Sequence, residues 1–268
     1  MTASLASLTA LTERLIALAM LLQTLEFLQI RAVCADSGVW RFGLLRSEYR
    51  SLPFPLRQLC ELCCPYRAFL TLLCVRLGCA LALLGAGVSG VLPLLWASQA
   101  LICIRFRGSF NGGSDAMSMV VLTATSVAAV SGHAVWAGKL ALYYIAVQVT
   151  LSYVVAGLAK VQHADWRDGS ALRHFVAAGA YEVPERLARA SWLRHRGLGR
   201  VLAWGVMGFE CLFPCAWLGP RACLVVLALG LVFHGVNAWV FGLNRFLIAW
   251  AAGYPALFYC ALSLQGAI

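Results

Sequence analysis

This chain of 268 residues is 62% hydrophobic and only 12% charged. A soluble domain carries about 25% charged residues, so this chain has too few to cover itself with a polar surface. The net charge of the chain is +10, and in a membrane protein such an excess of Lys and Arg is expected in the cytoplasmic loops. No soluble basic module is present that would bind nucleic acid. We therefore expect one all-α transmembrane domain over residues 1–268, a multi-pass protein of the cell membrane whose main partner is the lipid bilayer.

Eight apolar segments follow one another along the chain, each close to the roughly 20 residues that a helix needs to cross a bilayer. Because they are continuously apolar instead of alternating, the segments predict helices and not the strands of a β-barrel. The first segment has no clear cleavage site after it, so we expect it to remain as a helix. The segments run approximately over residues 8–30, 68–87, 89–105, 116–132, 139–160, 199–217, 221–242 and 245–264.

Arginine is concentrated in two longer polar connections, residues 31–67 and 161–200. With eight spans, both connections lie on the same side of the membrane. The positive-inside rule then places them in the cytoplasm and both termini outside.

The one cysteine cluster is Cys60-Glu-Leu-Cys63-Cys64-Pro65. A C-x-x-C pair can be redox-active or can bind a metal. No second C-x-x-C and no adjacent histidine accompanies it, so a closed zinc site is not supported. We favour the interpretation of unpaired thiols beside a membrane interface.

Ionisable residues inside predicted spans are candidates for function because their burial in lipid is costly. Tyr153, Gly157 and Lys160 lie on one face of the fifth segment, and Trp166 follows shortly after it. Gly157 would let a neighbouring helix or a ligand approach closely. Lys160 would face inward, where a neutral amine can act as a base. The alternative is that Lys160 extends its amino group to the interface and has no further role.

Two later segments supply partners for this face. Glu210 stands one turn before the kinking Pro214, while His234 and Asn237 share one face of the seventh segment. For His234, a satisfied interior hydrogen bond is an alternative to catalysis. We expect Lys160 to share a cavity with Glu210 and His234. A tight Lys160–Glu210 ion pair and a neutral Lys160 base are competing expectations, because the carboxylate favours the charged amine.

Asp115 begins the fourth segment, where a carboxylate either caps the helix or contributes to a site. Glu26 and Arg76 also lie within predicted spans, and we expect them to serve only as a structural pair. The sequence contains no G-x-S-x-G, HExxH or Walker motif and no histidine cluster with metal spacing.

Three of these motifs together resemble a known family. The run from Tyr153 to Leu172, with Gly157, Lys160 and Trp166-Arg-Asp168-Gly169 at their spacings, looks like the signature of the HTTM ("horizontally transferred transmembrane") family. These domains are related to the vitamin K-dependent γ-carboxylase. The pattern Phe209-Glu210-(x)3-Pro214 and the later stretch Phe233-His234-(x)2-Asn237-(x)3-Phe241-(x)4-Phe246 are similar to further family motifs, and the resemblance covers roughly residues 8 to 260.

The resemblance implies a lyase-like membrane enzyme with a vitamin K-like quinone or hydroquinone as cofactor. In the carboxylase, the lysine that matches Lys160 deprotonates the hydroquinone, and oxygenation then yields the base that removes a proton from a substrate glutamate. By this resemblance Lys160 and His234 are catalytic. The resemblance also implies that the pocket for a peptide or small-molecule substrate is lined by Tyr153, Gly157, Trp166, Glu210, Asn237 and Asp115.

The sequence departs from the carboxylase pattern at one catalytic position. The upstream histidine of the carboxylase corresponds to the region Asn111–Asp115, and no histidine is present there. A second function therefore stays open, that of a non-catalytic accessory protein for the maturation, export or immunity of a secreted peptide.

Overall fold

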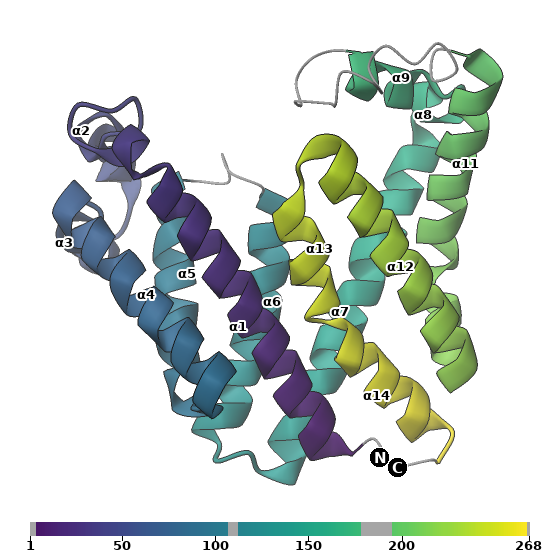
Figure 1. Ribbon diagram of the computed structural model, residues 1–268, viewed down its shortest axis with the longest axis horizontal. Helices are drawn as coiled ribbons and strands as arrows, with labels where there is room; N and C mark the ends of the chain where they lie inside the picture. Colours follow the sequence, from purple (N-terminus) through teal and green to yellow (C-terminus); the bar gives the residue numbers. More distant parts are fainter. Residues whose placement is uncertain (1–3, 107–111, 178–194, 267–268) are drawn as a thin grey trace. The chain divides into compact units, whose positions relative to one another are not determined.

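The apolar segments form helices throughout the part of the chain that the structure describes. The computed structural model describes residues 4–106, 112–177 and 195–266, and no strand occurs within these ranges. The longer helices (Figure 1) are α1 (Leu5–Gln29), α4 (Tyr66–Ala86), α5 (Leu92–Phe106), α6 (Gly112–Val130), α7 (Val135–Gln162), α11 (Arg196–Leu212), α12 (Pro220–Phe241), α13 (Asn244–Ala251) and α14 (Tyr254–Leu264).

Shorter helices occupy the connections. The arginine-rich connection between α1 and α4 contains η1 (Arg31–Cys34), α2 (Phe42–Leu45), η2 (Arg46–Ser51) and α3 (Phe54–Cys63). The remaining short elements are η3 (Ser89–Val91), α8 (Ala164–Arg167), α9 (Ser170–Ala177) and η5 (Phe213–Leu218).

Within the described ranges, eight helical stretches are long and apolar enough to cross a membrane, and each overlaps one of the predicted segments. The prediction of an all-α, multi-pass integral membrane protein is thereby confirmed. The last span differs from its prediction because it consists of two helices, α13 and α14, which are interrupted after Ala251. Pro255 lies in the first turn of α14, where its missing N–H and fixed φ are tolerated.

The described chain divides into two compact units. Unit 1 contains residues 142–247 and 253–268, and unit 2 contains residues 5–141 and 248–252, with residues 1–4 grouped with unit 1. Both α7 and α13 contribute residues to both units. The prediction of a single domain stays a prediction, and each unit is described by itself.

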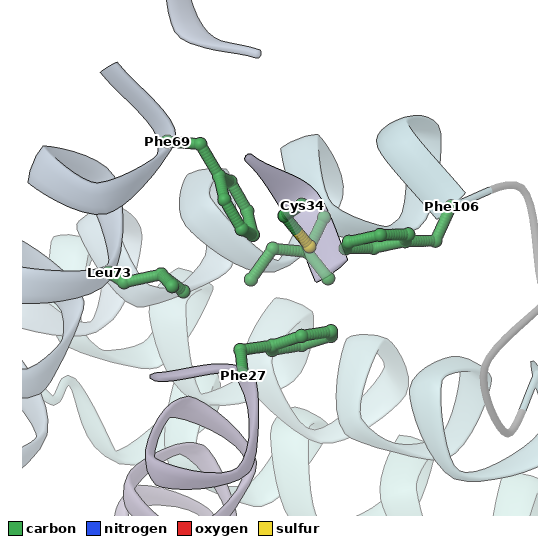
Figure 2. Close-up of a cluster of buried hydrophobic side chains, with 6 residues drawn as sticks. Phe27, Cys34, Phe69, Leu73 and Phe106 are labelled. Carbon is green, nitrogen blue, oxygen red and sulfur yellow. The ribbon is translucent and has the colours of Figure 1, made fainter. Parts of the chain in front are cut away.

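In unit 2, α1 packs against α4 and α6, and α5 packs against α4 and α6. Aromatic side chains form its buried core (Figure 2), where the rings of Phe27 and Phe106 stack with centroids 5.1 Å apart. The ring of Phe69 meets both edge-on, at 6.2 and 5.9 Å. Leu73, Ile102 and Cys34 complete this cluster, so the end of α1 is tied to the start of α4 and the end of α5.

In unit 1, α12 packs against η5 and α14, and α11 packs against α8 and α9. The sequence explains the change from α11 to η5, because Pro214 has no backbone N–H to donate the hydrogen bond that would continue α11. A tighter helix replaces the α-helix over Phe213–Leu218 and turns the chain at Gly219, whose φ is +149°. After this turn, the Phe233 ring of α12 lies 5.5 Å from the Phe209 ring of α11, measured between centroids.

Candidate functional site

Lys160 and Glu210 form an ion pair inside unit 1. The amino group of Lys160, near the end of α7, donates to both carboxylate oxygens of Glu210 on α11, each at 2.7 Å. The Glu210 side chain is only 5% exposed, whereas that of Lys160 is 21% exposed. The amino group also lies 5.3 Å from the centre of the Trp166 ring on α8. Lys160 therefore faces a carboxylate and an aromatic ring, and it does not extend freely to the interface.

Gly157 lets the backbones of α7 and α11 approach closely enough for this pair. A Cβ atom at this position would lie 2.8 Å from Cys211 Sγ, 2.9 Å from Glu210 Cβ and 3.0 Å from the Cys211 backbone nitrogen. No side chain fits there without moving α11. The expectation that Gly157 permits a close helix approach is confirmed, and Glu210 sits at the contact.

A second polar group of unit 1 is built around Tyr153, two turns before Lys160 on α7. Its hydroxyl lies 2.7 Å from His234 Nε2 on α12 and 2.7 Å from the Tyr254 hydroxyl on α14. Gly230 makes room for this arrangement, because a Cβ there would collide with the Tyr254 hydroxyl. His234 is thus buried and hydrogen-bonded at the junction of three helices.

An aromatic layer surrounds Tyr153 on the side of α11 and η5. The Tyr153 ring stacks on Phe213 at 3.8 Å and meets Phe209 edge-on at 5.5 Å. Phe209 in turn lies 5.5 Å from Phe233. The two polar groups of α7 are separated by seven residues, about 10 Å along the helix.

Lys160 borders a cavity of about 170 Å³ in unit 1. Its wall is mostly apolar, with the amino group of Lys160 and the amide of Asn237 as its polar groups. Asn237 donates from Nδ2 to the Phe233 carbonyl at 2.9 Å, which orients its side chain. The lining residues are Lys160, Trp166, Leu172, Phe175, Val206, Phe233, Asn237, Phe241 and Leu243.

A second cavity of about 280 Å³ lies next to the first. Leu172, Val206, Phe233, Asn237 and Phe241 line both cavities. The second cavity extends over α9, α11 and α12 and reaches Leu202 and Val236, which are 43% and 51% exposed. The wall around Lys160 therefore continues along an apolar surface toward the outside of the helices.

The predicted site residues fall into three places, two in unit 1 and one in unit 2. Lys160, Trp166 and Asn237 line the first cavity, and Glu210 binds Lys160. His234 is not among the lining residues, although its neighbour Phe233 is, and Tyr153 holds it. Sequence reasoning missed Tyr254, whose only signal was a tyrosine following a glycine in the middle of an apolar segment.

Asp115 belongs to unit 2 and takes part in another buried network. Its Oδ1 accepts from Gln23 Nε2 at 2.6 Å and from Gln99 Nε2 at 3.2 Å. Arg76 Nη2 donates to Gln99 Oε1 at 2.6 Å and also to Gln23 Oε1. This network joins α1, α4, α5 and α6, and it gives Asp115 a structural role in addition to its place in the first turn of α6.

The Asp168-Gly169 pair of the family motif shapes the turn between α8 and α9. Asp168 Oδ1 accepts from the Ser170 backbone N–H at 2.8 Å. Hydrogen bonding to the Ser170 side chain, and then to its backbone, lowers the pKa of the Asp168 carboxyl. Gly169 has a φ of +78°, and a Cβ there would collide with the Arg200 backbone. The turn thus fixes α9 against the start of α11, beside the cavities.

The cysteine cluster lies in the connection before α4 and its thiols are unpaired. Cys60 and Cys64 are buried with Phe42 and Tyr49, whereas Cys63 is half-buried. Burial raises the pKa of the Cys64 thiol to about 12. Within the described ranges, no group of three or more His, Cys, Asp or Glu side chains is placed to hold a metal ion.

Comparison of the chain with models of protein families, with curated proteins and with solved structures finds no match.

Proposed function

We propose that this membrane protein is an enzyme of the kind that the HTTM resemblance implies, and that it takes up a proton from a quinol-like molecule bound in the cavity beside Lys160. The observation that carries the proposal is the ion pair of Lys160 with the buried Glu210 carboxylate, placed so that Lys160 lines an aromatic cavity. An apolar pocket with a few convergent polar groups is the usual form of a small-molecule site.

The residues around the cavity fit a flat aromatic ring that carries oxygen. Trp166, Phe175 and Phe233 provide aromatic surface, while Lys160 and Asn237 provide the polar groups. The second cavity offers an apolar surface of the type that a hydrocarbon tail needs. When bound, a quinol supplies the hydroxyl proton and the reducing equivalents of the reaction.

A proton shift within the ion pair makes Lys160 a base without changing the net charge of the pair. Moving one proton from Lys160 Nζ to a Glu210 oxygen, along a hydrogen bond of 2.7 Å, leaves a neutral amine beside a neutral carboxylic acid. Lys160 Nζ then receives the proton of a bound hydroxyl and becomes charged again. Uptake of the quinol proton leaves the pair with one positive charge, beside the oxyanion of the quinol. Glu210 holds the first proton throughout this step, so the carboxylate assists the lysine base instead of excluding it.

The same ion pair favours a second candidate function. Lys160 donates to both oxygens of Glu210, and a pair that is satisfied in this way stabilises the contact of α7 and α11 without any ligand. This observation supports a non-catalytic accessory protein for the maturation, export or immunity of a secreted peptide. Ligand binding in the cavity distinguishes the two functions.

Binding of a reduced short-chain naphthoquinone tests the proposal. The full-length protein is placed in lipid nanodiscs without oxygen, and the quinol retained is compared with that of empty nanodiscs. We expect the wild type to retain quinol and Val206→Trp, which fills the cavity, to bind at least about ten times more weakly, a loss of about 1.4 kcal/mol. The matched control is Val201→Trp on the same helix, where the valine is 68% exposed.

The control variant should bind as the wild type does. Equal retention by the wild type, by Val206→Trp and by empty nanodiscs would contradict the proposal and favour the accessory function.

A further inference from the structure

Glu13 is a buried carboxylate of unit 2 with one oxygen that has no hydrogen-bond partner in the described part of the chain. It lies on α1 and is 5% exposed. Its Oε2 accepts from Ser89 Oγ at 2.6 Å, and its Oε1 is the unpartnered atom. Since a buried charge without compensation is costly, this oxygen points to a missing ligand.

Thr9 supplies a second atom of the same kind. It stands one helical turn before Glu13, so the two side chains share a face of α1. Thr9 is 7% exposed, and its hydroxyl oxygen is also buried without a hydrogen-bond partner among the described residues. Two unpartnered oxygens on one buried face indicate a common ligand more strongly than either atom alone.

A basic side chain close to this carboxylate is that of His133, in the turn between α6 and α7. Its Nδ1 lies 3.8 Å from Glu13 Oε1, beyond hydrogen-bond distance, and its side chain is 45% exposed. The turn holds His133 at a φ of +54°, an uncommon conformation for a residue other than glycine. An exposed imidazole at this distance makes no hydrogen bond to the buried carboxylate.

The other charged groups of the surrounding helices lie elsewhere. Arg76 of α4 and Asp115 of α6 are hydrogen-bonded around Gln23, ten residues further along α1, which is about 15 Å by the helix rise. Arg14 of α1 and Lys139 of α7 are exposed. Figure 1 shows the start of α1, the α4–α5 connection and the α6–α7 turn at the same end of unit 2.

We propose that Glu13 Oε1 and Thr9 Oγ1 bind a monovalent metal cation of the size of Na⁺, while Ser89 holds the second carboxylate oxygen. Hard cations prefer carboxylate and hydroxyl oxygens. A cation satisfies both unpartnered oxygens and neutralises the buried charge, whereas a water molecule leaves the charge in place. A single carboxylate suits a monovalent ion better than Ca²⁺, which takes six to eight oxygen ligands.

Thermal unfolding of the full-length protein tests this site. The melting temperature Tm is measured by tryptophan fluorescence in sodium chloride and in choline chloride of equal ionic strength. A ligand that binds only the folded state raises Tm, and we expect saturating sodium to raise it by about 3 °C. Glu13→Gln should abolish this difference, and Thr9→Val should reduce it. The matched control on the same helix is Glu26→Gln, which should retain the full shift.

Other outcomes overturn the proposal. An equal Tm of the wild type in both salts would mean that water fills the site. A second contrary outcome is that sodium has no effect, while the wild type loses stability relative to Glu13→Gln as the pH rises. Glu13 would then carry a proton, and the proposed metal site would be wrong. Should Glu13→Gln fail to fold, the sodium response of Thr9→Val decides alone, and an undiminished response would also contradict the site.

Discussion

At the scale of single residues, Glu210 is the direct partner of Lys160. The carboxylate is nearly fully buried, and the amine is its direct hydrogen-bond donor. Removing one partner of a buried pair leaves an uncompensated charge and costs about 3–5 kcal/mol. Variants of either residue should therefore be judged against stability as well as activity. Trp166 adds a cation–π contact at 5.3 Å, which supports the charged amine at rest.

The cysteine cluster gives a prediction that depends on pH. The Cys64 pKa is raised from 9.0 to about 12 by burial, and the thiolate is the form that reacts with alkylating reagents. In the folded protein we therefore expect maleimide to label the half-buried Cys63 faster than Cys64 at pH 8. The rate at Cys64 should rise about tenfold per pH unit up to pH 10.

Mass spectrometry of the labelled peptides measures both rates, and a urea-unfolded sample is the control in which the difference disappears. Because the pKa of Cys64 is raised in the folded state, its buried neutral thiol contributes fully to stability below about pH 9. This contribution is lost as the pH rises toward 12. Equal labelling of both cysteines in the folded protein at pH 8 would contradict the burial of Cys64.

Sequence reasoning anticipated some of these residues and missed others. Lys160 and Glu210 stand out because charges are rare in apolar segments, and their rarity predicts that they meet. Tyr254 does not stand out, since its hydrogen bond to Tyr153 joins residues 101 positions apart. The family resemblance places Asp115 with the Lys160 site, but its hydrogen bonds in unit 2 depend on packing that no local pattern encodes.

At the scale of elements, the contact of α7 with α11 decides the geometry of the site. Gly157 permits this contact, and its neighbours across the interface are Glu210 and Cys211. We expect Gly157→Ala to lower the free energy of unfolding by about 1–3 kcal/mol, because an extra methyl group in a packed interior forces a backbone shift. Measurement of Tm in detergent checks this.

Gly208→Ala on α11 is the matched control, since a Cβ there meets no atom within 4 Å. Alanine is the better helix former, so this variant should be neutral or slightly more stable. If the two variants have the same Tm, α7 and α11 do not pack as closely as described.

The extents of the long helices followed well from the sequence, because their apolar segments are long and continuous. The break between α13 and α14 was not predicted, although Gly253 and Pro255 mark it. In an apolar segment of spanning length, a glycine–proline pair can be tolerated within one helix, so composition alone did not separate the two helices. The short helices of the arginine-rich connections carry no comparable signal.

At the scale of the whole molecule, the chain is a multi-pass membrane protein whose polar chemistry is confined to a few buried clusters. Unit 1 holds the Lys160–Glu210 pair and its cavity, while unit 2 holds the network of Arg76 and the Glu13 site. The prediction that both arginine-rich connections face the cytoplasm rests on charge asymmetry and an even number of spans. The eight candidate spans in the described part of the chain agree with that number.

The most direct test of the central claim is quinol-dependent oxygen consumption by Lys160→Ala and Lys160→Arg beside the wild type. Arginine keeps the positive charge but does not release its proton, so it preserves an ion pair with Glu210 and cannot act as a base. We expect both variants to lose at least about a hundredfold in rate, the usual contribution of a general base, while Lys160→Arg still binds the quinol. Wild-type oxygen consumption by Lys160→Arg would contradict the role of Lys160 as the proton acceptor.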